Sequence, residues 1–411
     1  MSEILFIAHR IPFPPDRGDK IRSHHVLKRL ARLAPVHVAT FADDEQDAEA
    51  EAELAATARS YCLVDRSKWL PLAGVEALLR RQPVSVTAFY DRRLADYVAK
   101  MLREKDISAI YVYSGQMGQY VPDDYTGRLI VDFVDVDSAK FDAYAGSGNL
   151  LSRWINAREG RVLHAEEARL AVRAHASLLV SAEEAALFAA RLGEQERLRA
   201  NVRALENGID TLAFDPFTVA PEPKLAALSG PKLIFTGQMD YPPNVAAVLR
   251  ATKRLMPRIR AVIPDASLHI VGRKPSAEVL ALDGVDGCRV WGRVDDIAAY
   301  LRAADLALVP LEIARGVQNK VLEAMAMALP VVVSSGAATG IGAEPDREFV
   351  IGEDDDALVR AGISLLRDRQ RAKTMGLAAR RFLEQNRSWE AVLAPLPSLI
   401  GLADPRVSDV A

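Results

Sequence analysis

Short apolar runs alternate with longer amphipathic stretches along the first half of the chain. The short runs are rich in β-branched residues and predict strands at EILFIAH (3–9), VHVATF (36–41), AIYVYS (109–114), LIVDFVDV (129–136) and ASLLVSA (176–182). Amphipathic stretches around 20–33, 90–104 and 151–173 predict helices between some of them. This alternation is typical of strand–helix units built around a parallel sheet.

The alternation stops at ENGIDTLAFDPFTVAPEPKLAALSGP, which is rich in Pro, Gly and polar residues and predicts a linker. A second series of strands follows at KLIFTG (232–237), SLHIVG (267–272), CRVWG (288–292), LALVP (306–310) and PVVVSS (330–335). The pattern predicts two doubly wound, Rossmann-like α/β domains facing a shared cleft, at 1–205 and 206–390. Residues 391–411 are expected to return to the first domain. Open parallel sheets bind ligands beyond the carboxyl ends of their strands, so those loops are the place to search.

Composition narrows the class of protein. The 411 residues are 50% hydrophobic and 26% charged, a balance typical of soluble globular domains. The formal net charge is −3 and no long run of like charge occurs, which argues against a nucleic-acid partner. Cys62 and Cys288 are far apart and near no histidine cluster, so we expect neither a disulfide framework nor a zinc site, and a reducing cytoplasm fits. We also expect neither a signal peptide nor a membrane span.

A polar cluster opens the stretch ARGVQNKVLEAMAMALPVVVSS (314–335). Asn319 is expected to cap a helix that ends near Ala328, and the helix N-terminus with Arg315 and Lys320 would attract phosphate. Glu323 would accept hydrogen bonds from sugar hydroxyls. A purely structural interpretation also fits: Asn319 only caps, Glu323 only complements the helix dipole, and Arg315 pairs with Glu312.

The same stretch resembles the nucleotide-sugar binding segment of glycosyltransferase family 4, which comprises retaining enzymes of the GT-B fold. The resemblance covers nearly the whole chain in the family's order: NGID with Phe214 and Pro216, FTGQMDYPPN, LHIVG, WGRVDDIAAYLRAADLALVPL and SWEAVLAPL. The segments PFPPDRGDKIRSHHVLKRLA and VDFVDVDSAKF are similar to a bacterial subgroup of sugar transferases associated with exopolysaccharide and PEP-CTERM gene clusters.

The resemblance implies how the polar cluster holds the donor. Glu323 matches the second glutamate of the family's paired motif, which binds the nucleotide ribose. The first glutamate, eight positions earlier, contacts the donor sugar in the family, but Arg315 stands at that position. This departure reverses the charge presented to the sugar, so an interaction with phosphate or a carboxylated sugar is the expected substitute. Gly316 and Asn319 belong to the same predicted donor-binding segment.

Other loops of the second domain supply the rest of the implied donor site. Val294 and Asp295 match a turn whose backbone reads the nucleobase, although a plain loop explains Asp295 almost as well. Gly237 begins a phosphate-facing loop, but the Arg and Lys that usually follow are absent, and Asn244 lies near one of those places. The positive charge is therefore expected from Arg273, Arg315 and Lys320.

The loop between the first strand and first helix of the first domain carries Gly18 and Asp19. Gly18 would allow close approach of the backbone to a ligand, and Asp19 would cap a helix that begins at Lys20. The resemblance implies contact of this loop with the donor phosphates and the acceptor. The histidines at 9, 24 and 25 do not have the spacing of a metal site.

Asp135 and Asp137 are spaced like the metal-binding aspartates of the other large glycosyltransferase fold. In a GT-B-like chain the donor is bound by a helix dipole and basic residues, so no metal is predicted. On a strand both side chains would point to one face, and Asp137 is the candidate for orienting the acceptor hydroxyl. Alternatively, the two carboxylates only accept hydrogen bonds from a nearby arginine or from backbone N–H groups.

The predicted helix from Lys20 to Leu33 alternates basic and apolar residues. A solvated helix face explains this pattern, and so does electrostatic attachment to anionic lipid, where a lipid-linked acceptor would lie.

Three further functions compete with the transferase. An oxidoreductase is suggested by Gly336, Gly340 and Gly342 in the spacing of a dinucleotide loop, but too little chain follows for such a domain. A sugar-nucleotide 2-epimerase on the same fold and a non-catalytic sugar-nucleotide binder both stay open, because fold does not fix chemistry.

Taken together, the residues and the resemblance predict a retaining, metal-independent glycosyltransferase without a cofactor. Its predicted partners are a nucleotide-sugar donor and a glycan or lipid-linked glycan acceptor, in the cytoplasm or peripheral at the inner face of the membrane. Arg315 and Lys320 would stabilise the leaving diphosphate, with Asp137 orienting the acceptor.

Overall fold

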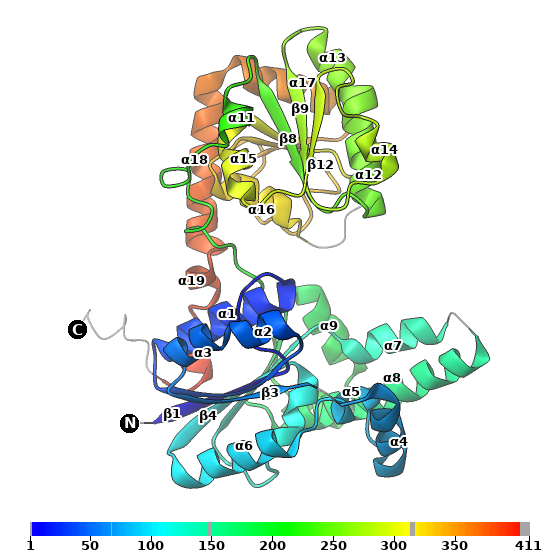
Figure 1. Ribbon diagram of the computed structural model, residues 1–411, viewed down its shortest axis with the longest axis vertical. Coiled ribbons are helices and arrows are strands. Elements are labelled where there is room, and N and C mark those ends of the chain that lie inside the picture. The colour runs from blue at the N-terminus through cyan, green and yellow to red at the C-terminus, as the bar shows by residue number, and fades with distance from the viewer. Residues whose placement is uncertain (1, 67, 147–148, 313–316, 403–411) are drawn as a thin grey trace. The chain divides into compact units, whose positions relative to one another are not determined.

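The computed structural model describes residues 2–66, 68–146, 149–312 and 317–402 (Figure 1). The chain folds as two units. One comprises the residues up to Asn207 together with those from Val392 on, and the other comprises Gly208–Ala391.

The first unit contains a parallel sheet with the strand order β3-β2-β1-β4-β5-β6-β7. Its strands are β1 (Glu3–Ala8), β2 (Val36–Ala42), β3 (Ser60–Asp65), β4 (Ile107–Tyr113), β5 (Arg128–Val134), β6 (Ala176–Leu179) and β7 (Val202–Ala204). Its helices are α1 (Gly18–Ala31), α2 (Glu45–Glu49), α3 (Glu51–Thr57), α4 (Leu70–Arg80), α5 (Val84–Thr87), α6 (Arg92–Glu104), the 3₁₀ helix η1 (Gly115–Tyr120), α7 (Asp137–Ala145), α8 (Leu150–Arg173), α9 (Ala182–Arg191), α10 (Glu194–Arg199) and α20 (Leu396–Leu399).

The second unit contains a parallel sheet with the order β10-β9-β8-β11-β12-β13. Its strands are β8 (Lys232–Thr236), β9 (Ser267–Val271), β10 (Cys288–Gly292), β11 (Leu306–Val309), β12 (Val331–Ser334) and β13 (Val350–Gly352). Its helices are α11 (Pro223–Ala226), α12 (Pro242–Arg250), the π-helix η2 (Ala251–Leu255), α13 (Met256–Arg260), α14 (Ala277–Leu280), α15 (Ile297–Ala303), α16 (Asn319–Ala326), α17 (Asp355–Arg367), α18 (Arg369–Asn386) and α19 (Trp389–Val392).

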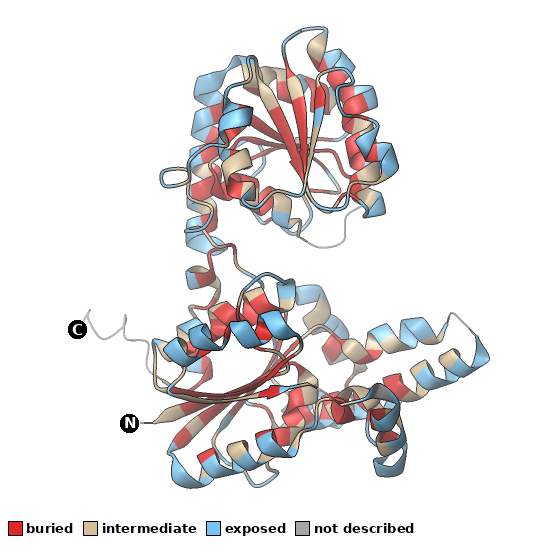
Figure 2. Ribbon diagram, in the orientation of Figure 1, coloured by how far each residue is buried: buried red, intermediate tan, exposed pale blue. Residues whose placement is uncertain are grey.

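Both sheets have the doubly wound order, in which the direction of strand addition reverses once. The reversal lies between β1 and β4 in the first unit and between β8 and β11 in the second. Helices lie on both sides of each sheet, and the strands are the most deeply buried elements (Figures 1 and 2). All seven residues of β2, for example, are buried. This burial explains why the strands read as continuous apolar runs in the sequence.

The first helix differs from its prediction at its N-terminus. α1 begins at Gly18, its N-cap residue is Arg17, and no side chain caps it, so the prediction that Asp19 caps this helix is wrong. Lys20 and Arg22 are each only 1% exposed, which rules them out as parts of a basic outer face for lipid. No helix in the described ranges combines the length and apolar character that crossing a membrane would require.

Candidate functional site

A hollow lies at the carboxyl ends of β8 and β11, where the strand order of the second unit reverses. Open α/β sheets bind their ligands at this point of reversal. The hollow is lined by the β8–α12 loop, the loops after β9 and β10, and the start of α16. The predicted donor-binding residues that line it are Gly237, Asn244, Arg273, Val294, Asn319, Lys320 and Glu323.

Some predicted residues are not part of this lining. Arg315 and Gly316 lie outside the described residues. Asp295 is exposed and is not among the lining residues, whereas the next residue, Asp296, caps α15 by accepting hydrogen bonds from the Ala298 and Ala299 amides. The sequence reasoning missed Arg293, which does line the hollow and directly precedes Val294. Its position directly before Val294 could have identified Arg293 from the sequence.

Lys320 lines this hollow from α16. Its Nζ donates a 2.6 Å hydrogen bond to Asn244 Oδ1 and lies 4.9 Å from the centre of the Phe235 ring. Asn244 Nδ2 in turn donates to the Gln238 carbonyl at 2.9 Å, which fixes the amide. Burial lowers the pKa of Lys320 to about 8, although the carboxylate of Glu323 acts in the opposite direction. The ammonium group is therefore partly desolvated, and an anionic ligand would stabilise its charge.

Glu323 lies three residues after Lys320, in the second turn of α16, so it is not a first-turn residue that complements the helix dipole. Burial raises the pKa of its carboxyl group to about 7, against the opposing charge of Lys320. A partly desolvated carboxylate in a ligand-sized hollow is suited to accept hydrogen bonds from hydroxyl groups.

Gly237 is required by the geometry of the hollow. Its φ of +150° lies in the region that favours glycine, and a Cβ at this position would lie 2.9 Å from Asn244 Nδ2 and 3.3 Å from Lys320 Nζ. A side chain here would displace the two groups that give the hollow its polar wall.

Asn319 does not have the predicted capping role. It is the first residue of α16, and the N-cap residue is Gln318, whose side chain does not cap the helix. Both residues line the hollow. The backbone N–H groups of the first turn of α16 therefore begin at its wall, an arrangement that suits phosphate.

Arg273 contributes to the lining from the loop after β9. Its guanidinium donates a 3.1 Å hydrogen bond to Gln238 Oε1, and the residue is exposed. Gln238 Nε2 also donates to Asp240 Oδ1 at 2.6 Å. Arg273 is thus held beside the β8–α12 loop in a position from which it can reach a bound anion.

Asp19 belongs to a polar cluster at the corresponding edge of the first unit, where β1 and β4 end. Its carboxylate accepts from the Arg10 guanidinium and lies 3.5 Å from His9 Nε2. The hydrogen bond with His9 and the charge of Arg10 hold the pKa of Asp19 well below its usual value, although burial acts to raise it. His9 stacks on Tyr113, with ring centres 5.8 Å apart. The space beside Gly18 is open.

Asp135 and Asp137 do not lie on a strand, contrary to the prediction. β5 ends at Val134, and α7 begins at Asp137. Both carboxylates instead accept hydrogen bonds from Lys140 Nζ, at 2.9 Å and 3.0 Å. Val134 has a φ of +69°, an unusual conformation for a β-branched residue, and the backbone turns there before Asp135. Asp137 remains half-exposed at the start of α7.

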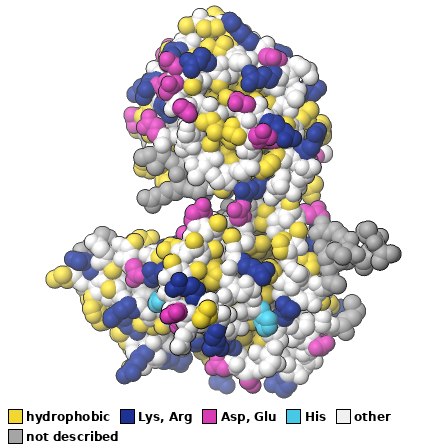
Figure 3. Space-filling view, turned by 180° about the vertical axis from the view of Figure 1, so that it is seen from behind, with side chains coloured by type: hydrophobic (Ala, Val, Ile, Leu, Met, Phe, Trp, Pro, Cys, Tyr) yellow, Lys and Arg dark blue, Asp and Glu magenta, His cyan; other side chains and the backbone are white. Residues whose placement is uncertain are grey.

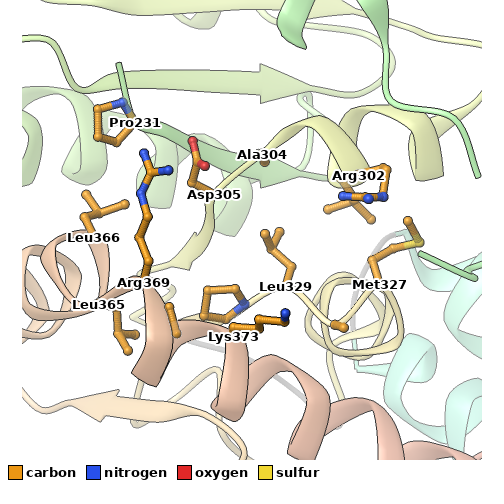
Figure 4. Close-up of a pocket in the computed structure, with 14 residues that line it drawn as sticks. Pro231, Arg302, Ala304, Asp305, Met327, Leu329, Leu365, Leu366, Arg369 and Lys373 are labelled. Atoms are coloured by element: carbon orange, nitrogen blue, oxygen red, sulfur yellow. The ribbon is translucent and has the colours of Figure 1, made fainter. Parts of the chain in front are cut away.

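A second hollow lies on the opposite edge of the second sheet (Figure 4). It is lined by residues that precede β8, β11 and β12, with Arg302, Asp305, Arg369 and Lys373 around it. Arg302 donates to the Pro216 carbonyl at 2.8 Å, and Asp305 pairs with Lys232, so two of these charges have structural partners. Because ligands of parallel sheets bind at the carboxyl ends, this hollow is not the candidate site.

The described residues contain no group of three or more His, Cys, Asp or Glu side chains placed to hold a metal ion. The metal-independent reaction stays a prediction.

Sequence comparison finds known proteins that are similar to parts of the chain. Residues 230–368 match the family described as Glycosyl transferases group 1. A GDP-mannose-dependent monoacylated alpha-(1-6)-phosphatidylinositol monomannoside mannosyltransferase from Corynebacterium glutamicum is 31% identical over 222 residues, which are 49% of this chain and 56% of the relative. A GDP-mannose-dependent alpha-(1-6)-phosphatidylinositol monomannoside mannosyltransferase from Mycolicibacterium smegmatis is 33% identical over 162 residues, 36% of this chain and 42% of the relative. The chain thus spans about half the length of the curated relatives that it matches.

Solved structures are similar over the whole chain. HepE from Anabaena in complex with UDP has a TM-score of 0.60 at 15% identity, with 100% of both chains covered. Sucrose-phosphate synthase from Thermosynechococcus elongatus has a TM-score of 0.58 at 16% identity, also over 100% of both chains. WaaG, a glycosyltransferase involved in lipopolysaccharide biosynthesis, has a TM-score of 0.55 at 16% identity, over 97% of this chain and 100% of WaaG. The chain has the GT-B fold, and its residues 230–368 form a domain similar to the group 1 glycosyl transferases.

Proposed function

We propose that the protein is a retaining glycosyltransferase that moves a sugar from a nucleotide-sugar to a saccharide or lipid-linked saccharide. One observation carries this proposal: Lys320 and Glu323 of α16 both line the hollow at the carboxyl edge of the second sheet, and both are partly desolvated there. The Lys320 ammonium group suits a phosphate, and the Glu323 carboxylate, three residues later on the same helix, suits the ribose hydroxyls of the same nucleotide.

The comparisons support the donor class. Two curated relatives use GDP-mannose according to their names, and HepE was solved with UDP. We therefore propose a guanosine or uridine diphosphate sugar as the donor. The role in exopolysaccharide or other cell-surface glycan synthesis, and the cytoplasmic location, rest on the sequence resemblance and composition alone.

The proposed reaction needs charge stabilisation more than a strong base. The bond between C1 of the sugar and the phosphate oxygen breaks, and the acceptor oxygen bonds to C1 on the same face. The proton of the acceptor hydroxyl passes to the leaving phosphate oxygen. Lys320 and the first N–H groups of α16 stabilise the charge that develops on the diphosphate. Arg315 is proposed to assist, and Asp137 to orient the acceptor hydroxyl.

The Glu323→Gln variant tests the ribose contact. We expect its affinity for a nucleoside diphosphate at pH 7.5 to fall by about 10- to 100-fold, because a charge-assisted hydrogen bond contributes about 1.5–3 kcal/mol. The measurement is calorimetric titration. Glu278→Gln, which changes an exposed glutamate of α14, is the matched control and should bind like wild type. Wild-type affinity in Glu323→Gln would remove the proposed role.

The affinity for the nucleotide is also expected to depend on pH. Glu323 accepts stronger, charge-assisted hydrogen bonds from hydroxyls as a carboxylate than as a carboxylic acid, so affinity should rise as pH rises through about 7. Lys320 binds phosphate as an ammonium ion, so affinity should fall again above about pH 8. Titrations from about pH 6 to about pH 9 would show a maximum between these values. The same titration of Glu323→Gln is the control, because ionisation of the ligand affects the wild type and the variant equally. The rise in affinity between about pH 6 and about pH 7 should be smaller in the variant. An equal rise in both proteins would contradict the role of Glu323.

A further inference from the structure

The second hollow, at the amino edge of the second sheet, carries positive charge that no acidic residue balances. Arg302, Arg369 and Lys373 line it, and Asp305 is the one acidic residue among its described lining residues. The Asp305 carboxylate lies 3.3 Å from Lys232 Nζ, so its charge is already neutralised. On the face of this unit that Figure 3 shows, basic and acidic side chains are instead interspersed. The second hollow is therefore a local concentration of positive charge.

The three cationic side chains of the second hollow have unused hydrogen-bond donors. Among the described residues, Arg302 donates only from its Nε, to the Pro216 carbonyl at 2.8 Å. The side chains of Arg369 and Lys373 form no hydrogen bond or ion pair with any residue that the structure describes. These two residues are four positions apart on α18, so they lie on the same side of the helix, where like charges repel each other. A bound anion would relieve this repulsion.

The C-terminus of α16 lies at the second hollow, and cations are favoured near the C-terminus of a helix. The lining includes residues 327–330, which directly follow α16. However, the last four carbonyl groups of α16 already accept hydrogen bonds. Those of residues 323–325 accept from backbone N–H groups, and that of Ala326 accepts from Arg380 Nη1 at 2.6 Å. The three cations of the second hollow are therefore not needed to complete this helix.

The shape and lining of the second hollow limit what it can bind. Leu301 and Leu329, which are 1% and 5% exposed, belong to its lining. Apolar walls beside charges of one sign strengthen the attraction of those charges for an anion. The volume is about 240 Å³, below the roughly 300–1,000 Å³ of sites for drug-sized ligands, so a small ligand fits. Figure 4 shows Arg369 and Arg302 on opposite sides of the hollow, with Lys373 between them in this view.

We propose that the second hollow binds a small organic molecule that carries two anionic groups, a phosphate and a carboxylate. The planar guanidinium of arginine presents several N–H donors that match either group. Arginines on opposite sides suit a ligand with one anionic group at each end, and Lys373 adds a third positive charge between them. The inference does not depend on the proposed function, since no lining residue of the second hollow lines the nucleotide site.

Calorimetric titration of the full chain with 3-phosphoglycerate, which carries a phosphate and a carboxylate, tests the proposal. Wild type should bind it with a Kd below about 1 mM. Raising NaCl from about 0.05 M to about 0.5 M should weaken binding, because salt screens exposed charges. The double variant Arg369→Gln/Lys373→Gln should bind at least about tenfold more weakly, because it loses two charge-assisted contacts. Lys253→Gln/Arg360→Gln removes two exposed charges of the same unit outside the hollow and should bind like wild type.

The Lys320→Ala variant locates the bound anion. Lys320 lines the hollow at the carboxyl edge and not the second hollow, so this variant should bind 3-phosphoglycerate as tightly as wild type. A loss of affinity in Lys320→Ala, with wild-type affinity in Arg369→Gln/Lys373→Gln, would place the ligand at the carboxyl edge and overturn the proposal. Absence of binding to wild type, or an equal loss in Lys253→Gln/Arg360→Gln, would also overturn it.

Chemical labelling of wild type gives a second readout that needs no variant. Lys373 and Lys253 are both exposed, so acetic anhydride should acetylate both, and mass spectrometry measures the rate at each lysine. We expect 3-phosphoglycerate to slow acetylation of Lys373 and to leave that of Lys253 unchanged, because Lys373 lines the second hollow and Lys253 does not. An unchanged rate at Lys373 in the presence of the ligand would contradict the proposal.

Discussion

Replacement of Lys320 by alanine is expected to lower turnover by at least about tenfold, and by about 100-fold if its ammonium is a main stabiliser of the leaving diphosphate. Lys320 is held over the hollow by Asn244 and Phe235, so its charge is already positioned before a ligand binds. Its partial burial makes the charge more effective, since less water competes with the phosphate. Alanine removes the charge and leaves the rest of α16 unchanged.

The measurement is initial rate with saturating acceptor, together with the affinity for the nucleoside diphosphate and for the nucleoside alone. The variant should lose affinity for the diphosphate and retain it for the nucleoside, because the ribose contact through Glu323 is still present. Lys253→Ala, which removes an exposed lysine of the same unit, is the control. Turnover within about threefold of wild type in Lys320→Ala would show that this side chain does not bind the phosphate.

The Asp132→Asn variant is expected to destabilise the first unit by about 3–5 kcal/mol, the usual cost of removing one partner of a buried ion pair. Asp132 accepts two hydrogen bonds from Arg22, at 2.9 Å and 3.1 Å, and one from the Tyr111 hydroxyl at 2.7 Å. All three side chains are at most 1% exposed. Asparagine keeps the shape but leaves the guanidinium charge buried without a counter-charge.

Hydrogen exchange of the β4 and β5 amides measures this change within the first unit. The matched control is Asp96→Asn, because the Arg92–Asp96 pair is 88% and 72% exposed and should contribute almost nothing. Affinity for the nucleoside diphosphate should be unchanged, since the residues of the proposed nucleotide site all belong to the second unit. A loss below about 1 kcal/mol would mean that Arg22 finds another partner, and the ion pair would then not be a main stabiliser of this unit.

The sheets were predictable because their strands are buried on both faces. Runs such as VHVATF and PVVVSS are mainly apolar and rich in valine, and they correspond to β2 and β12. The sequence reasoning missed β3, whose SYCLVD residues are mostly half-buried, and the three-residue strands β7 and β13. Short or partly exposed strands depend on pairing with neighbours, which a local pattern does not reveal.

Much of the candidate site was predictable from motifs at strand ends. Gly237 and Lys320 are far apart in sequence, but each follows a strand next to the reversal point, so the fold brings them together. The failures came from competing partners. Asp19 binds Arg10 instead of capping α1, and Arg22 binds Asp132, which lies 110 residues away. Such long-range partners cannot be read from spacing along the chain.

The central claim is that the hollow beside α16 binds a nucleoside diphosphate. Calorimetric titration of the purified chain with GDP, UDP, ADP and NAD, each with and without EDTA, tests it most directly. We predict tight binding of GDP or UDP that EDTA does not weaken and that Glu323→Gln does. Binding of NAD alone, or of no nucleoside diphosphate at all, would contradict the claim.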